Sequence, residues 1–342
     1  MVLFLLIFSF QGFSEKLTVL AELTDPSILE IDGQEIFILD EARVYVYSLQ
    51  DYGLIRQFGK KGEGPGELKT LQDIPITMQV FKEYVLLNSY NKIVFFSKSG
   101  KMLKEKRIPF LAFQIVPFGK NYAVTKFTRS PDGGSQLSVL LFNPKFEELK
   151  RLYETELQND MRKKKIAFPF AITFSQCSGD RLLVVDQKKE FEILRFDLEG
   201  NRLVPIKKPY QKIPVSETFK KESWEWLKLQ PSYKLVPERL TQMIYFPEYL
   251  PVIRNLLVKE QKIYLQTYKT KDSLSEFFIL DLQGRVEKTL FLPGASKDRQ
   301  IRPNPAVTYT FKGDEYYYLE EDMEEEEWNL HKVTWTSSFP RS

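Results

Sequence analysis

The sequence contains one histidine and one cysteine, and these shortages exclude several classes of function. His331 alone excludes histidine-based catalytic triads and metal sites with several histidines. Cys177 alone excludes an intramolecular disulfide and any zinc or iron–sulfur site built from cysteines. There is also no Gly-x-Ser-x-Gly elbow and no His-Glu-x-x-His motif. A carboxylate pair could still do acid/base work, but no pair in the sequence is singled out as one.

Long apolar runs are missing as well. The apolar run at residues 2–10 is far shorter than the roughly 20 residues that cross a bilayer. Gly12-Phe13-Ser14 follows it, with small residues at the two positions that a signal peptidase reads, so we expect export with cleavage after Ser14. The alternative is an apolar N-terminal strand, because no basic residue precedes the run. No cysteine follows it, so we expect no lipoprotein anchor.

Neither sign of charge dominates the chain. The 49 Lys and Arg residues against 46 Asp and Glu residues give a net charge of +3, which does not indicate nucleic acid, and no RNA- or DNA-reading motif is present. What the chain has in quantity is Phe (27), Tyr (17) and short runs of Val, Ile and Leu. This composition favours strands over long helices.

Glycine is concentrated in one stretch, Phe-Gly-Lys-Lys-Gly-Glu-Gly-Pro-Gly-Glu-Leu at residues 58–68. So many glycines and a proline predict a loop. Spaced glycines can also cradle a phosphate. Three features oppose that reading here: Pro65 removes an amide, no Lys-Ser/Thr pair follows, and no helix is predicted before Pro75. The stretch is therefore interpreted as a structural linker.

This stretch resembles the inter-blade loop of bacterial six-bladed β-propellers related to NHL-repeat proteins, in which a similar Phe-Gly-x-x-Gly-x-Gly-Pro-Gly-Glu segment joins one blade to the next. The weaker blade pattern covers residues 17–333. The resemblance implies a propeller fold in an exported protein and carries little chemistry.

A unit of four short runs recurs along the chain, as expected for propeller blades of about 40 residues. Asp-Leu-x-Gly turns recur between third and fourth runs at residues 197–200 and 281–284, where a tight hairpin needs a residue with positive φ. Five complete units are predicted, at residues 28–58, 76–107, 114–153, 172–205 and 252–291.

The sixth unit, at residues 307–333, has only three strands. We expect a strand at residues 17–23 to supply the fourth and close the ring, which leaves no open blade edge. The predicted organisation is an all-β, six-bladed propeller over residues 15–335, a signal peptide over 1–14 and a tail over 336–342.

Residues 206–251 break the repeat, and helical spacing within them predicts helices at 216–229 and 237–246. Trp224, Trp226 and Tyr233 belong to this helical insertion between blades 4 and 5. Either these aromatic residues pack onto the propeller, or they form a lid or partner-docking surface.

Strand order predicts which residues share a face of the disc. Turns between second and third strands lie on the same face as the linkers between blades. The glycine-rich loop, the insertion and the basic run at 162–165 should therefore lie together. One residue per blade is expected to ring the channel mouth on that face: Asp40, Asn88, Lys126, Asp186, Thr267 and Glu320.

In NHL-like repeats an acidic or amide residue often occupies this turn, which Asp40, Asn88 and Asp186 match and Lys126 and Thr267 do not. Converging oxygen atoms could bind calcium. The alternative is that the aspartates bind nearby backbone amides and fix their turns. The acidic run at 320–327 is either a solvated loop or a surface that steers a basic partner.

The sequence thus predicts an exported, monomeric binding or scaffolding module for a protein, peptide or glycan, without nucleic acid, a stable membrane anchor or a required cofactor. Two alternatives remain: a calcium-assisted propeller enzyme, lactonase-like or lyase-like, and a cytoplasmic repeat protein. Fold analogy alone does not assign a reaction.

Overall fold

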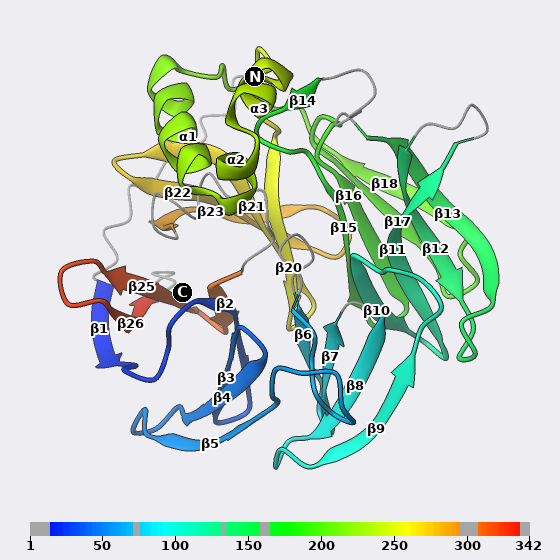
Figure 1. Cartoon of the computed structure of the whole chain (residues 1–342), viewed down its shortest axis with the longest axis vertical. Helices are drawn as coiled ribbons and strands as arrows, with labels where there is room; N and C mark the ends of the chain where they lie inside the picture. Colours follow the sequence, from blue (N-terminus) through cyan, green and yellow to red (C-terminus); the bar gives the residue numbers. More distant parts are fainter. Residues whose placement is uncertain are drawn as a thin grey trace, which may run out of the picture.

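The computed structural model describes residues 14–70, 76–89, 91–130, 135–157, 165–294 and 307–335. Six four-stranded antiparallel sheets stand around a common axis, each blade meeting its neighbours face to face (Figure 1). No helix within these ranges is long and apolar enough to cross a membrane.

Strands follow one another in order within the first five blades. Blade 1 comprises β2 (Pro26–Asp32), β3 (Glu35–Asp40), β4 (Arg43–Ser48) and β5 (Leu54–Phe58); blade 2 comprises β6 (Thr77–Val80), β7 (Tyr84–Ser89), β8 (Lys92–Ser97) and β9 (Met102–Arg107); blade 3 comprises β10 (Gln114–Phe118), β11 (Asn121–Arg129), β12 (Ser135–Phe142) and β13 (Glu148–Glu156); blade 4 comprises β15 (Thr173–Ser178), β16 (Arg181–Asp186), β17 (Glu192–Phe196) and β18 (Arg202–Lys207); blade 5 comprises β20 (Ile253–Lys259), β21 (Lys262–Lys271), β22 (Leu274–Asp281) and β23 (Val286–Pro293).

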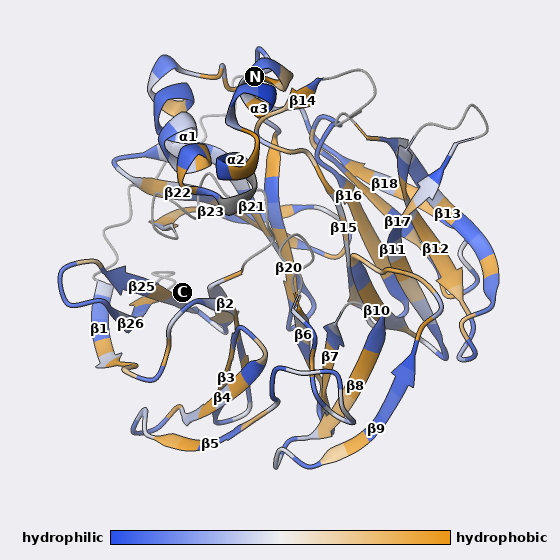
Figure 2. Ribbon diagram, viewed as in Figure 1, coloured by the Kyte–Doolittle hydropathy of each residue, from blue (hydrophilic) through white to orange (hydrophobic). Residues whose placement is uncertain are grey.

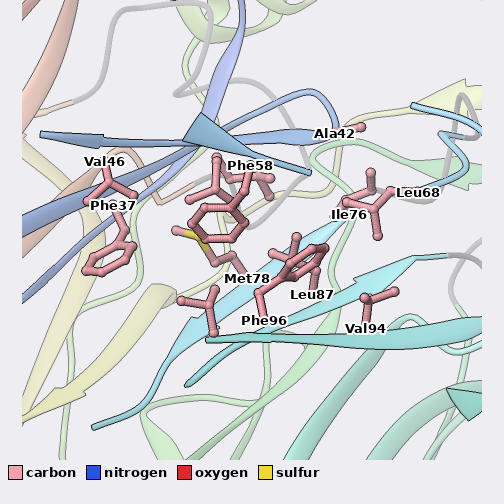
Figure 3. Close-up of a cluster of buried hydrophobic side chains, with 13 residues drawn as sticks. Phe37, Ala42, Val46, Phe58, Leu68, Ile76, Met78, Leu87, Val94 and Phe96 are labelled. Atoms are coloured by element: carbon pink, nitrogen blue, oxygen red, sulfur yellow. The ribbon is translucent and has the colours of Figure 1, made fainter. Parts of the chain in front are cut away.

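The middle strands of each blade are apolar on both faces because each face packs on a neighbouring blade (Figure 2). In β3, Phe37 and Leu39 pack against blade 2, whereas Ile36 and Ile38 pack against blade 6. Figure 3 shows the first of these two contacts, where Phe58 and Phe96 meet with ring centroids 5.1 Å apart. The core is thus divided into separate layers between blades.

The predicted Asp-Leu-x-Gly turns adopt the expected geometry. Gly200 and Gly284 have φ values of +74° and +88°. The carboxylate of Asp197 accepts hydrogen bonds from the amides of Glu199 (3.1 Å) and Asn201 (2.7 Å), and Asp281 binds its own turn in the same way. The aspartate therefore fixes the turn and the glycine permits it.

The last blade is closed by the N-terminal strand, as predicted. Its sheet order is β1 (Ser14–Val19), β26 (Glu327–Thr334), β25 (Glu315–Asp322) and β24 (Tyr309–Lys312). The strand begins and ends earlier than the predicted 17–23, because Leu20 and Leu23 turn inward and are buried between blades 6 and 1. The amide of Leu20 still donates to the carbonyl of Trp328 (2.7 Å).

The glycine-rich loop is a folded linker whose amides are already occupied. The amide of Gly64 donates to Glu67 Oε2 (3.0 Å), and that of Gly66 donates to Glu105 Oε2 of blade 2 (2.9 Å). Lys92 Nζ lies 3.2 Å from the same Glu105 oxygen and donates to the carbonyl of Gly64 (3.0 Å). Carboxylates of the protein thus take the positions that a phosphate would need.

The insertion contains α1 (Glu217–Leu229), α2 (Pro231–Leu235) and α3 (Pro237–Met243). Ser216 caps α1 by accepting from the amide of Phe219, as is typical of helix starts. The predicted helix at 237–246 is too long at its C-terminal end. After Met243 the chain forms β19 (Ile244–Tyr245), which pairs in parallel with β14 (Ile166–Ala167) from the linker between blades 3 and 4. This pairing across the sequence overrides the local helical spacing.

Candidate binding face

The helical insertion is a small structure with its own core. Phe168, Leu227 and Met243 are buried at its centre. The predicted surface residues Trp224, Trp226 and Tyr233 pack partly into this core: Trp226 lies 6.0 Å from Phe168 and Trp224 lies 6.4 Å from Tyr233, measured between ring centroids. This packing accounts for all three aromatic residues, and their role toward a partner stays a prediction.

The two aspartates of the predicted channel-mouth ring bind groups of the protein itself. Asp40 is buried and accepts from the amides of Thr24 (2.6 Å) and Asp25 (3.0 Å), which precede blade 1. Asp186 is buried and accepts from the hydroxyl of Tyr153 in blade 3 (2.7 Å) and from the amide of Lys188 (3.0 Å). Both carboxylates therefore fix turns and join neighbouring segments.

Thr267 and Lys126 also have partners of their own. The hydroxyl of Thr267 donates to the buried Glu276 carboxylate (2.9 Å), which also accepts from the hydroxyl of Tyr210 (2.6 Å). The ammonium of Lys126 lies 4.2 Å from the ring centroid of Phe110, and partial burial lowers its pKa.

Asn88 and Glu320 are opposite extremes of exposure among the six predicted residues. Asn88 is fully buried, and neither atom of its amide has a hydrogen-bond partner among the described residues. Glu320 is exposed, and one of its carboxylate oxygens lies 3.2 Å from His331 Nε2. None of the contacts of the six predicted residues joins two of them, so their action as one site stays a prediction.

Glutamine side chains occupy the inner edges of the blades. Gln79 Nε2 donates to the carbonyl of Ile115 in the next blade (2.6 Å), and Gln114 Nε2 donates to the carbonyl of Ser175 (2.9 Å). Gln114 Oε1 also accepts from the amide of Ser175 (2.9 Å), and Gln187 Nε2 donates to the carbonyl of Arg254 (2.9 Å). Side chains thus satisfy innermost-strand groups that would otherwise be free to pair with a peptide strand.

A pocket of about 240 Å³ lies where the insertion meets blade 4. We call it the seam pocket; its lining includes Pro169, Lys188, Lys189, Lys212, Tyr249 and Pro251. Backbone hydrogen bonds join the two ends of the insertion beneath it, from the amide of Val215 to the carbonyl of Glu248 (3.0 Å) and from the amide of Leu250 to the carbonyl of Ile213 (2.9 Å). These hydrogen bonds hold the backbone at the base of the insertion, and with it this side of the pocket, in place.

Both signs of charge and one aromatic ring meet in the seam pocket. Lys212 Nζ lies 3.1 Å from Glu190 Oε1 and 5.8 Å from the ring centroid of Tyr249. The ammonium of Lys188 donates to the main-chain carbonyl of Glu156, and partial burial lowers its pKa. The adjacent Glu248 carboxylate raises the pKa of Tyr249. Such a lining can hold a polar segment of either charge and one flat group.

Two other expectations concern charged segments. Residues 162–164 of the predicted basic run lie outside the described residues. The acidic run forms the exposed turn between β25 and β26, where Asp322 accepts from the amide of Glu324 (3.1 Å). Within the described ranges, no group of three or more His, Cys, Asp or Glu residues is placed to hold a metal ion. The calcium-assisted enzyme stays a hypothesis.

Comparison with known proteins supports the architecture. A family model described as a 6-bladed beta-propeller matches residues 21–174. The chain is a six-bladed β-propeller. The relation to NHL-repeat proteins stays a prediction, because neither this match nor the fold distinguishes it. No curated protein matches the sequence.

Solved structures similar to this propeller differ widely in origin. One is a member of the duf4221 family from Bacteroides vulgatus, with 10% identity, a TM-score of 0.48, and coverage of 94% of this chain and 98% of that one. Another is the β-propeller domain of Myceliophteria thermophila Cps50 (Swd1), with 11% identity, a TM-score of 0.45, and coverage of 94% and 100%. These values carry no argument about function.

The seam pocket was not predicted from the sequence. Two of its three lysines lie in the turn Gln187-Lys188-Lys189-Glu190, which follows the predicted Asp186 directly, and its rim comes from the Pro-rich end of the insertion. A signal was present, since Pro247 and Pro251 flank an exposed tyrosine. What the sequence did not indicate is that the two segments meet.

Proposed function

We propose that this propeller is a non-enzymatic binding module outside the cytoplasm, and that it holds a segment of a protein, peptide or glycan in the seam pocket. The observation that supports the proposal is the position of the pocket. A turn of blade 4 and the base of the insertion build it together, with three lysines and Tyr249 at its surface. Concave sites where two structural units meet are common binding sites.

The chemistry of the pocket favours binding over catalysis. Lys212 forms an ion pair with Glu190, and Lys188 donates to the carbonyl of Glu156; neither contact sets a nucleophile beside a base. Tyr249 is 39% exposed and can stack on a flat group of a ligand. A mixed charge and an exposed ring are the features with which a surface recognises a polar chain.

Site-specific photocrosslinking in the native host tests this proposal. A photoreactive side chain at Tyr249 should give a discrete adduct, whereas the same group at Leu149, which is 53% exposed on an outer strand, should not. The adduct at Tyr249 should weaken when Lys188 and Lys212 are replaced by Ala. Equal products from both positions, or an adduct insensitive to the lysines, would refute the seam pocket as the binding site.

The location has its own measurement. Protein purified from the native host should begin at Glu15, because cleavage after Ser14 is the expected processing step. A mature chain that retains Met1 would instead support the cytoplasmic alternative. This result does not depend on the crosslinking experiment.

A further inference from the structure

A second pocket lies between blades 2 and 3, on the face of the disc opposite the seam pocket. Its lining includes Tyr84, Phe95, Lys104, Pro117, Lys120 and Tyr122, and its volume is about 270 Å³. Gly119 and Lys120 form the turn between the first and second strands of blade 3, whereas Lys188 and Lys189 lie in a turn between second and third strands. These two kinds of turn lie on opposite faces, so the interblade pocket is a separate site.

The walls of the interblade pocket are aromatic and held in place by the core. Tyr84 lies 5.5 Å from Phe95 and 4.8 Å from Phe81 between ring centroids, and Tyr122 stacks on Phe146 at 5.1 Å. All five rings belong to the apolar layer between blades 2 and 3. Rings fixed in this way provide a preformed surface, which lowers the entropy lost when a ligand binds.

The charge of the interblade pocket is of one sign. Lys104 and Lys120 line it, no Asp or Glu does, and neither lysine forms an ion pair within the described part of the chain. Lys104 Nζ lies 4.3 Å from the ring centroid of Phe95, which places the ammonium against the wall. Glu83, the exposed residue next to Tyr84, is the acidic residue whose charge affects the pKa of that tyrosine. The seam pocket, in contrast, contains Glu190 and Glu248.

Two tyrosine hydroxyls complete the lining. Burial raises the pKa of Tyr84, and the charge of Glu83 raises it further; burial also raises the pKa of Tyr122, with a smaller contribution from Tyr84. Both therefore remain neutral donors at physiological pH. Neither hydroxyl makes a hydrogen bond to another described residue, so both are available to a ligand.

We propose that the interblade pocket binds a carboxylated sugar ring, such as a uronic acid unit of an acidic polysaccharide. The two ammonium groups can bind the carboxylate, the tyrosine hydroxyls can donate to its oxygens, and the aromatic walls can pack on the ring. The volume corresponds to about nine water molecules at ~30 Å³ each, which is enough for one ring and too little for a drug-sized ligand. A bare acidic side chain would leave most of the space empty.

Ligand-observed NMR with purified protein tests the proposal, using glucuronate, glucose, inorganic sulfate and a short polyglutamate peptide as probes. Glucuronate should bind, and glucose should bind at least tenfold more weakly. The double variant Lys104→Gln/Lys120→Gln should weaken glucuronate binding at least tenfold, and Tyr84→Phe/Tyr122→Phe severalfold. Lys101→Gln, an exposed lysine of the same blade outside the pocket, is the matched control and should change nothing.

Several outcomes would overturn the proposal. Equal binding of glucuronate and glucose would exclude recognition of the carboxylate, and tighter binding of polyglutamate would assign the pocket to an acidic peptide. Sulfate that binds as tightly as glucuronate would exclude recognition of the ring. Unchanged binding in the Lys104→Gln/Lys120→Gln variant would place the ligand elsewhere, and thermal unfolding of each variant shows that the fold is retained.

Discussion

The contact between the glycine-rich loop and blade 2 offers a quantitative test of how this propeller holds its blades together. Lys92 and Glu105 are 7% and 18% exposed, and their charged atoms lie 3.2 Å apart. At an effective dielectric constant of 20 the attraction between them is about 5 kcal/mol before desolvation is subtracted. Replacing one partner leaves the other buried and unpaired, which costs about 3–5 kcal/mol in fully buried pairs.

We therefore expect Lys92→Met to lower the free energy of unfolding by about 3 kcal/mol, because it leaves both the carboxylate and the Gly64 carbonyl without the ammonium. Glu105→Gln should cost about 2 kcal/mol, since its amide oxygen can still accept from Gly66. The double variant should be more stable than the sum of the two losses predicts, by about 1.5 kcal/mol.

Urea unfolding followed by tryptophan fluorescence and circular dichroism measures these differences where the two transitions coincide. The matched control is Lys60→Met, because the Lys60 side chain is 72% exposed where it pairs with Glu67, so its loss should stay below about 1 kcal/mol. If Lys92→Met and Lys60→Met were equally mild, or the double-variant losses simply added, the buried pair would not join the loop to blade 2.

The same pair predicts a dependence on pH. Although partial burial opposes the shift, the Gly66 amide and Lys92 hold the pKa of Glu105 below its ordinary value. A lowered carboxyl pKa gives stability that is present above the unfolded-state pKa of about 4.3 and is lost as the pH falls through the folded-state pKa. The stability difference between the wild type and Glu105→Gln should therefore shrink in acid.

Three further predictions concern other parts of the chain. Burial lowers the pKa of His331, so its ring protons, the only histidine signals in the NMR spectrum, should titrate below about 6.5. The free energy of unfolding should fall as the pH drops through that range, because the unfolded chain binds the proton more readily. A titration midpoint above 6.5 would contradict this. Burial raises the pKa of the Cys177 thiol to about 12, so a thiol reagent at pH 8 should label this partly exposed residue much more slowly in the folded than in the denatured protein. Equal labelling rates in the two states would contradict this. Leu20→Ala should destabilise the protein by about 3 kcal/mol in urea unfolding, because Leu20 is 1% exposed between blades 6 and 1. Val19→Ala, at an exposed position, is the control and should have little effect. Equal losses in the two variants would mean that the layer between blades 6 and 1 contributes no stability.

The blades could be predicted because their signals are local. Gly200 and Gly284 mark hairpins that need positive φ, and the short apolar runs between turns correspond to the observed strands. Closure of the ring could also be predicted, since an orphan strand and an incomplete unit leave one sensible pairing. The exact start of β1 could not, because loose alternation around Lys16 and Thr18 conceals an irregularity in the pairing with β26.

The site was harder to predict because the residues chosen in different blades do not occupy equivalent positions in their hairpins. Asp40 is the last residue paired in its hairpin, opposite Arg43, whereas Ser89 and not Asn88 holds that position in blade 2. A shift of one residue turns a side chain to the other face of its sheet. Similar turn residues therefore point into different blade interfaces. The pairing of β14 with β19 was missed because two-residue strands leave no periodic signal.

The closing strand has a consequence for how the protein is made. Glu15 pairs with Lys332 and Val19 pairs with Asn329, so β1 is held by a strand from the opposite end of the chain. During translation this stretch therefore leaves the ribosome long before its partner exists. Non-local pairing of this kind slows folding and leaves apolar surface uncovered in the meantime. Until the strands of blade 6 are synthesised, the apolar side chains of Ile36 and Ile38 have no blade 6 against which to pack.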